Sequence, residues 1–349
     1  MEERDSEVPL GRKPKIAITF NLKKGIAGKT ADAEAEYDHM DTVYSIEKAL
    51  QTVGCEVTLV EAEAAMVNRL QENPVDMVFN IAEGLRGRGR EAEVPAVCNM
   101  LGIPFTGSDE TTLSVALDKA LTKRLVGTYR VPTPRSVVYT KDGSRATHGL
   151  RFPVIVKPNA EGSSKGVSDV SVVETPDALR RLVNEYTALY DQDMLAEEYI
   201  EGREFTVGVL GNGKSRRVFA PMEIIYQKAT QGSFHVYSYN VKQNYTHFIR
   251  YECPARLDAE TDAVMRKYAG IVCDALGCRD FARVDFRLSP EGKVYFIEIN
   301  PLPGLAPGYS DYPMLAEFCG VSYNDLIAAI LRAAAERCGV ALWERGDRK

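Results

Sequence analysis

The sequence lacks the features that mark several large classes of proteins. Its 43 Lys and Arg residues are outnumbered by 49 Asp and Glu residues, which gives a net charge of -6 and no overall positive field for nucleic acid. No apolar run approaches the length of a membrane span, and residues 1–13 are charged rather than apolar. We therefore expect a cytoplasmic protein that binds neither nucleic acid nor a membrane.

Patterned cysteine and histidine are also missing. The seven cysteines include no Cys-x-x-Cys pair, and the four histidines have no metal-ligand spacing. We expect free, reduced thiols and ordinary polar histidines, which disfavours a disulfide scaffold or a zinc centre. The chain also has no internal repeat and no low-complexity segment.

The length of 349 residues favours two or three packed domains. The first hundred residues alternate apolar strand patterns with amphipathic helix patterns, which predicts a parallel α/β sheet with ligands at one edge. The expected elements are strands at Lys15–Phe20, Glu56–Val60 and Asp76–Asn80 and helices at Asp41–Val53 and Ala64–Glu72.

The pattern changes after this first unit. We expect mostly hairpin-like strands from Arg203 to a final helix, and the other expected elements are helices at Thr111–Val126, Pro176–Tyr190 and Tyr323–Cys338 and a strand at Met194–Ile200. The predicted division is a flexible tail at 1–14, an α/β domain at 15–109, and α+β domains at 110–196 and 197–349.

Four polar residues near the C-terminus alternate with apolar ones in two predicted strands. A four-residue turn at 289–292 would pair Leu288 with Lys293 and place Arg283 opposite Glu298. One face then carries Arg283, Asp285, Glu298 and Asn300. Such oxygen ligands suit magnesium, and the arginine suits a phosphate. A surface hairpin with a cross-strand ion pair is the alternative.

Two further segments are open to both structural and functional interpretations. Residues 157–166, Lys-Pro-Asn-Ala-Glu-Gly-Ser-Ser-Lys-Gly, resemble a phosphate-cradling loop, although glycines also suit an ordinary hairpin. The segment is not a Walker loop, because the Gly-Lys-Ser/Thr ending is absent. Residues 197–204, Glu-Glu-Tyr-Ile-Glu-Gly-Arg-Glu, could border a nucleotide or form a surface strand end.

Taken together, these motifs resemble the ATP-grasp superfamily, and most closely the D-alanine-D-alanine ligase family. The matching blocks cover about residues 100–335 and are jointly specific. They are Gly102-Ile-Pro-Phe-Thr-Gly-Ser108, Asp118-Lys119-Ala-Leu-Thr-Lys123, Phe152-Pro-Val-Ile-Val-Lys157-Pro, Glu161-Gly-Ser-Ser164, residues 197–204, Ala282-Arg-Val-Asp285 and Ile297-Glu-Ile-Asn300-Pro-Leu-Pro-Gly304.

The resemblance implies a three-domain ATP-grasp fold in which two α+β domains clasp ATP beside the α/β domain. The implied ATP contacts are Lys119, Lys157, Glu161, Gly162, Ser163, Ser164, Glu197, Glu198, Tyr199, Ile200, Glu204 and Lys242. Asp285, Glu298 and Asn300 would bind two Mg²⁺ ions, with Mn²⁺ as an alternative. Arg283, Lys242 and Ser163 would act in catalysis. The resemblance also implies a homodimer.

The chain departs from the family where amino-acid substrates are recognised. A family histidine corresponds to Glu83, a glutamate to Arg90, and a tyrosine to Gln243. Asp311 falls beside the expected carboxylate of the second substrate, and a fixed aspartate would repel it. The candidate substrate contacts are Glu36, Asp38, Glu83, Arg90, Gln243, Arg283, Gly304, Ser310 and Asp311.

We therefore expect an ATP-dependent carboxylate-amine ligase that forms an amide through an acyl phosphate. Its small-molecule substrates are expected to be amino acids or similar metabolites other than two D-alanines. A genuine D-alanine-D-alanine ligase is the alternative, and a phosphotransferase of the same fold ranks below it. A non-catalytic nucleotide-binding module ranks last, because Lys119, Lys157 and the three metal-ligand candidates are all present.

Overall fold

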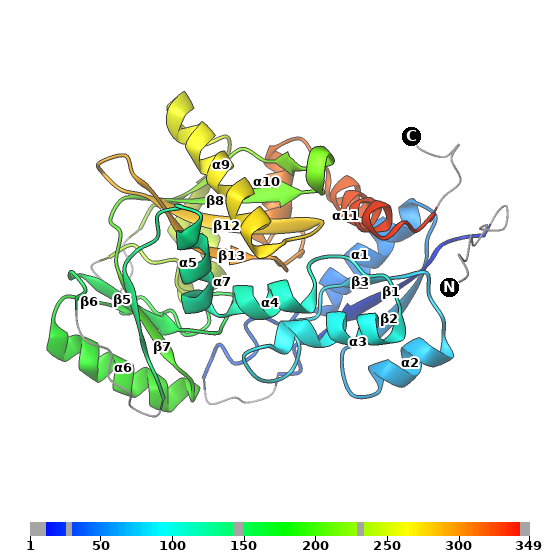
Figure 1. Ribbon diagram of the computed structural model, residues 1–349, viewed down its shortest axis with the longest axis horizontal. Helices are drawn as coiled ribbons and strands as arrows, with labels where there is room; N and C mark the ends of the chain where they lie inside the picture. Colours follow the sequence, from blue (N-terminus) through cyan, green and yellow to red (C-terminus); the bar gives the residue numbers. More distant parts are fainter. Residues whose placement is uncertain (1–11, 26–29, 142–148, 229–233, 343–349) are drawn as a thin grey trace.

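The computed structural model describes residues 12–25, 30–141, 149–228 and 234–342. Three sheets surround the middle of the molecule, with helices on their outer sides (Figure 1). Most of the expected flexible tail at 1–14 lies outside the described residues.

The N-terminal sheet is parallel, as predicted, and has the order β2 (Glu56–Glu61), β1 (Lys15–Phe20), β3 (Met77–Asn80). Alternation along β1 sends its side chains to two cores. Ile16, Ile18 and Phe20 join the core that contains helices α1 and α11, while Ala17 faces the core of α2 and α3. The bounds are α1 (Met40–Thr52), α2 (Met66–Glu72), α3 (Glu93–Leu101) and α11 (Tyr323–Cys338).

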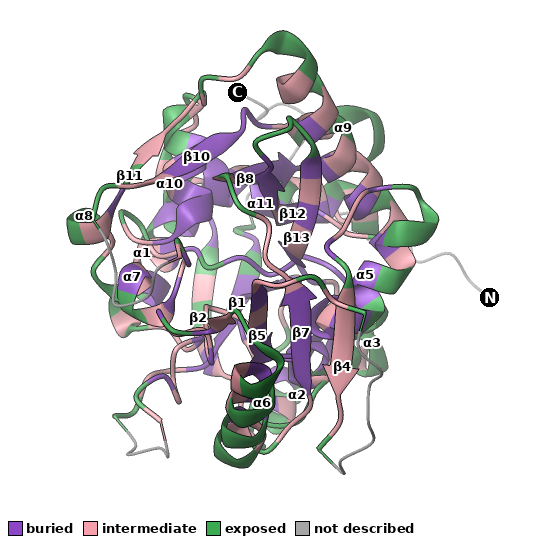
Figure 2. Ribbon diagram, turned by 90° about the vertical axis from the view of Figure 1, so that its left-hand side faces the viewer, coloured by how far each residue is buried: buried purple, intermediate pink, exposed green. Residues whose placement is uncertain are grey.

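The central sheet is antiparallel, with the order β4 (Ser136–Tyr139), β7 (Met194–Glu198), β5 (Val154–Pro158), β6 (Val172–Val173). Helix α6 (Pro176–Tyr190) packs Leu179, Val183 and Tyr186 against it. Thr175 caps this helix by accepting a hydrogen bond from the backbone N–H of Ala178. Strand β7 is buried, whereas the outer side of α6 is exposed (Figure 2).

The C-terminal sheet has the order β11, β10, β8, β12, β13, and β9 also pairs with β8. Helix α9 (Ala259–Leu276) covers one face, where Met265, Val272 and Leu276 pack against Phe205 and Phe286. The strands are β8 (Arg203–Leu210), β9 (Arg217–Val218), β10 (Met222–Tyr226), β11 (Ile249–Glu252), β12 (Phe281–Leu288) and β13 (Val294–Asn300).

The remaining helices connect these units. Helices α4 and α5, inside the predicted 110–196 unit, place Ala116 and Val126 in the core of the C-terminal sheet. We keep the three-domain division as a proposal. The remaining bounds are η1 (Arg90–Ala92), α4 (Glu110–Leu117), α5 (Lys119–Thr128), η2 (Gly213–Ser215), α7 (Tyr239–Gln243), α8 (Tyr245–Phe248) and α10 (Asp311–Phe318).

Two helix predictions were wrong. The single helix expected at Thr111–Val126 is two helices, because Asp118 adopts an extended conformation (ψ 97°) and caps α5 by accepting from the backbone N–H of Leu121. The 18-residue helix α9 lies in a region expected to be mostly strands. Among the described helices, none alone is long and apolar enough to span a membrane; α10 and α11 pass such a test only as a pair bent by 106°.

Candidate active site

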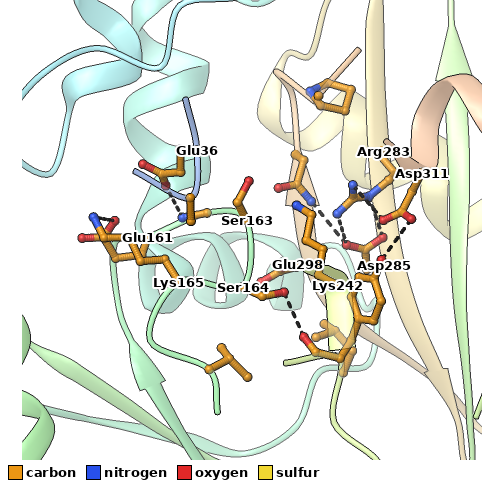
Figure 3. A pocket seen from close by; sticks show the side chains of 18 of the residues that line it. Glu36, Glu161, Ser163, Ser164, Lys165, Lys242, Arg283, Asp285, Glu298 and Asp311 are labelled. Carbon is orange, nitrogen blue, oxygen red and sulfur yellow. Dashed lines mark hydrogen bonds and ion pairs between the residues drawn. The ribbon is translucent and has the colours of Figure 1, made fainter. Parts of the chain in front are cut away.

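A large cavity opens where the three sheets meet. Its walls come from the loop before α1, the 161–166 loop, the β7–β8 connection and the β12–β13 hairpin. Figure 3 shows Glu36, Glu161, Ser163 and Ser164 on one side and Arg283, Asp285 and Asp311 on the other. We call residues 161–166 the flap.

The flap has an unusual backbone. Ser163 and Ser164 have φ values of 49° and 59°, in the left-handed region that non-glycine residues seldom adopt. The hydroxyl of Ser164 donates to the carbonyl of Tyr237 at 2.9 Å, and Lys119 Nζ donates to the carbonyl of Glu161. This conformation leaves Gly162, Ser163 and Ser164 on the cavity wall.

Glu36 and Arg90, both from the N-terminal part of the chain, hold the flap. The Arg90 guanidinium donates to Glu36 through Nε at 3.1 Å and Nη2 at 2.5 Å, and the backbone N–H of Gly162 donates to Glu36 at 2.5 Å. Arg90 also donates to the carbonyl of Ala160 and to the Glu161 carboxylate, each at 3.0 Å. Glu36 is thus committed to protein donors.

A buried charge triad lies at the β5–β7 wall. Glu197 forms ion pairs with Lys123 at 2.8 Å and Lys157 at 2.7 Å, and all three side chains are 3–6% exposed. Burial raises the pKa of Glu197, but attraction to the two lysines outweighs burial and lowers this pKa to about 2. Lys157, predicted for ATP, is therefore held in place by Glu197.

Glu204 is held at the neighbouring part of the wall. It accepts hydrogen bonds from Arg287 Nη2 at 2.7 Å and from the Tyr226 hydroxyl at 2.9 Å. Arg287 also donates to the carbonyl of Ile200 at 2.8 Å and lies over the Tyr199 ring, 4.7 Å from its centroid. These contacts position an aromatic surface and a carboxylate beside each other, as adenine and ribose would require.

The β12–β13 hairpin brings the four predicted polar residues together, but the predicted register was wrong. Arg283 pairs with Asn300, and Asp285 pairs with Glu298. The turn is one residue longer than expected, and a bulge at Ile297 adds a second shift. The bulge frees the Ile297 carbonyl to accept from Lys123 Nζ at 2.7 Å.

This hairpin offers a chemically suitable set of ligands for magnesium. Asp285 and Glu298 supply carboxylate oxygens and Asn300 an amide oxygen, all lining the cavity. Arg283 occupies both Asp285 oxygens, at 3.0 and 2.9 Å, and Lys119 lies 3.7 Å from Glu298. Among the described residues, no group of three His, Cys, Asp or Glu side chains could hold a metal, so the site would need Asn300 and non-protein oxygens.

Asp311 lies beyond Arg283 on the same wall. It accepts from the hydroxyls of Tyr251 at 2.7 Å and Tyr237 at 3.2 Å, and its other oxygen lies 3.4 Å from Arg283 Nη1. Asp311 is 3% exposed. Lys242 also lines this part of the cavity, and burial lowers the pKa of its amine.

Most of the predicted site residues line one cavity, and two do not. Gln243 is exposed and donates to the Tyr309 hydroxyl at 2.8 Å, while Arg90 lies behind the wall. The residues that line it are Glu36, Asp38, Glu83, Lys119, Lys157, Glu161, Gly162, Ser163, Ser164, Glu197, Glu198, Tyr199, Ile200, Glu204, Lys242, Arg283, Asp285, Glu298, Asn300, Gly304, Ser310 and Asp311.

Sequence reasoning missed Arg287, Glu91 and the role of Lys123. Arg287 lies two residues after Asp285 on the same strand, so alternation places it on the same face as Arg283 and Asp285 and could have identified it as a site residue. Lys123 is one helical turn after Lys119. Glu91 lines the cavity but carried no local signal, because its place depends on the fold around η1.

Comparison with known proteins adds a family assignment to this geometry. A family model described as "D-ala D-ala ligase C-terminus" matches residues 135–332. A D-alanine--D-alanine ligase of Cupriavidus necator is 33% identical over 312 residues, covering 88% of this chain and 90% of that protein. The chain belongs to the D-alanine-D-alanine ligase family.

Other similarities agree with this family. An uncharacterized protein, y4sG, of Sinorhizobium fredii is 35% identical over 303 residues, covering 84% of this chain and 87% of that protein. A D-alanine--D-alanine ligase structure from Bacillus anthracis has a TM-score of 0.74 at 22% identity, and the match covers 93% of this chain and 99% of that chain. The structure of the VanG D-Ala:D-Ser ligase of Enterococcus faecalis has a TM-score of 0.70 at 20% identity, and the match covers 93% of this chain and 100% of that chain.

These findings confirm three predictions. The chain is a member of the D-alanine-D-alanine ligase family, it has the ATP-grasp fold, and it is an ATP-dependent C–N ligase. The two solved structures bear on the fold alone at these identities.

Proposed function

We propose that this ligase joins an amino acid or small carboxylate to an amine, and that its substrates are not two D-alanines. The observation that carries the proposal is that the Glu36 carboxylate already accepts hydrogen bonds from protein donors. The resemblance implies that an acid in this region, Glu36 or Asp38, holds the first substrate's ammonium group, but here Arg90 and Gly162 occupy Glu36. A substrate amine would have to find another carboxylate.

The second substrate region supports the same proposal. Asp311 lies where the resemblance expects the second substrate's carboxylate, and it is buried beside Arg283. Although Tyr237 and Tyr251 donate to one Asp311 oxygen, the charge remains close to any incoming carboxylate. This disfavours an acceptor with a carboxylate close to its amine, as D-alanine has.

In the proposed reaction, an oxygen of the substrate carboxylate attacks the γ-phosphorus of ATP and ADP leaves. The amine nitrogen then attacks the acyl carbon, the C–O bond to phosphate breaks, and the amine loses a proton. Lys119, Lys157 and Lys242 would bind phosphate oxygens, Arg283 would stabilise negative charge during transfer, and the flap would exclude water.

ATP and magnesium are proposed as the cofactors of this chain. Asp285, Glu298 and Asn300 would hold magnesium, which supplies neutralising charge to the phosphates when bound. The number of ions, and Mn²⁺ as an alternative, remain predictions. The homodimer also remains a prediction, and light scattering of the purified protein would measure it.

The alternative is a D-alanine-D-alanine ligase, favoured by relatives that bear this name over most of their length. The test is incubation of the purified protein with ATP, Mg²⁺ and single or paired amino acids, with phosphate and amide products measured. We expect an amide whose two components are not both D-alanine. Rapid phosphate release with D-alanyl-D-alanine as product would refute the proposal, and a phosphorylated product without an amide would indicate a phosphotransferase.

A further inference from the structure

Three carboxylates line the end of the cavity that the N-terminal domain forms. They are Asp38, Glu83 and Glu91. Asn21 fixes the first two segments relative to each other: its carbonyl accepts from the backbone N–H of Asp38 at 3.0 Å, and its side-chain oxygen accepts from the N–H of Gly84 at 2.9 Å. Two segments far apart in sequence thus present acids to one cavity.

Gly84 brings Glu83 close to Glu91. Its φ is 76°, and a Cβ added there would lie 2.0 Å from the backbone carbonyl oxygen of Arg90. Only glycine permits this close approach of the 83–84 segment to the start of η1. Glu83 and Glu91 consequently share one end of the cavity and repel each other.

This end of the cavity contains too little positive charge for its acids. Glu91 is only 8% exposed, and within the described ranges no hydrogen bond or ion pair joins the side chain of Glu83 or Glu91 to any group. Two nearby cations are already engaged: Arg90 binds Glu36 and Glu161, and Lys165 also binds Glu161. Lys119 attracts Glu91 and Lys242 attracts Glu83, but both lysines are proposed to bind phosphate oxygens.

Electrostatics agree with a missing partner. Burial, and then repulsion from neighbouring acids, raises the pKa of both Glu83 and Glu91. An unpaired buried carboxylate is costly, and a cation that arrives with a ligand removes this cost. Burial raises the pKa of Asp38 as well, to about 7, although a hydrogen bond from Thr42 and the charge of Lys23 oppose this shift.

We infer that one substrate of this ligase carries two basic nitrogens, and that Glu83 and Glu91 bind them while the substrate carboxylate points to Arg283 and Lys242. The inference rests on the proposed ligase function. A single ammonium would balance only one of the two unpaired carboxylates. Diamino acids and amino acids with a basic side chain have the required charge.

A divalent metal ion is the other kind of cation that acids could bind. The described carboxylates of this end do not form a group of three or more His, Cys, Asp or Glu side chains arranged to hold a metal. Metal binding would also need acids that converge on one point. Because the described residues hold no such group, an organic cation with two nitrogens fits these acids better than a metal ion.

The test compares ornithine with norvaline, which has the same carbon chain without the terminal amine. Binding of both enantiomers of each is measured by calorimetry on the full chain with Mg²⁺ and a non-hydrolysable ATP analogue, so turnover is not needed. We expect ornithine of one configuration to bind at least tenfold more tightly than norvaline. Glu83→Gln and Glu91→Gln should each reduce this ratio several-fold. Glu72→Gln, an exposed residue at the end of α2, should leave it unchanged.

Three results would overturn the inference. One is equal binding of ornithine and norvaline, another is a preference that both glutamine variants retain, and the third is Mg²⁺ or Mn²⁺ binding that Glu91→Gln abolishes. Phosphate and amide formation with the same amino acids is a separate readout. If an amide forms from uncharged amino acids as readily as from ornithine, the inference fails and the ligase function stands. If ornithine binds and no amide forms, the proposed function fails instead.

Discussion

The two ends of the cavity treat buried charge differently. On the wall of the C-terminal sheet and β7, three carboxylates have cationic donors: Glu197 has two lysines, Glu204 has Arg287, and Asp285 has Arg283. At the N-terminal end, Glu83 and Glu91 have none within the described residues. Paired charges suit a site that is prepared for one fixed ligand, whereas unpaired charges need a ligand that brings the opposite charge.

The largest effect is expected at the paired end. Asp285→Asn removes a hard metal ligand and the partner of Arg283, so phosphate release from ATP should fall by about a thousandfold. Circular dichroism should show an unchanged fold. Glu291→Gln, on the exposed turn of the same hairpin, is the matched control and should keep full activity. Near-normal phosphate release by Asp285→Asn would refute the metal assignment.

The charge triad should matter for stability more than for specificity. Glu197→Gln leaves Lys123 and Lys157 buried without a carboxylate, and the free energy of unfolding should fall by about 3 kcal/mol. Urea unfolding measures this change. Glu198→Gln alters the next residue, which is half-buried and accepts one backbone hydrogen bond. Equal losses in the two variants would mean that the triad has no special role.

Weakening the Glu36–Arg90 contact should affect amino-acid binding more than ATP binding. Arg90→Lys keeps the charge but replaces the three nitrogens of the guanidinium with one, so it loses the two-point contact with Glu36 beside the contacts with Ala160 and Glu161. We expect the KM of the amino-acid substrate to rise about tenfold and the KM of ATP to change less. Arg86→Lys, an exposed change nearby, should alter neither KM. A larger effect on ATP would place Arg90 with the nucleotide end.

The smallest effect is a pH dependence of stability. Burial raises the pKa of Asp38 to about 7, above its value in the unfolded chain. The folded state therefore keeps a proton that the unfolded state releases, and the free energy of unfolding falls as pH rises from about 4 to 7. The free energy of unfolding of Asp38→Asn, measured relative to that of the wild type, should increase by on the order of 1 kcal/mol when the pH is raised from 5 to 8. The same difference between variant and wild type at both pH values would contradict this origin.

The sequence predicted elements whose signals are local. Helices α6 and α11 have the expected bounds, since Thr175 and Ser322 are caps that the chain itself displays. Helix α9 was missed although Asp258 caps its start and Gly277, at φ 72°, ends it. Its signals were present in the sequence, so this error was avoidable.

Features that depend on distant contacts could not be predicted in the same way. At the bulge, the Ile297 carbonyl accepts a hydrogen bond from Lys123, which lies 174 residues away in the sequence. At the break between α4 and α5, the Asp118 carboxylate accepts a hydrogen bond from Asn159. The nucleotide and metal candidates could be located because their motifs are local. The engagement of Glu36 by Arg90 could not, because it joins the loop before α1 to η1 and the flap.

The most direct test of the account is mass spectrometry of the products formed by the full chain with ATP, Mg²⁺ and an equimolar mixture that contains D-alanine, norvaline and ornithine. The account predicts ADP, phosphate and an amide with at least one component other than D-alanine, and that amide should contain ornithine. D-alanyl-D-alanine as the main product would contradict the account.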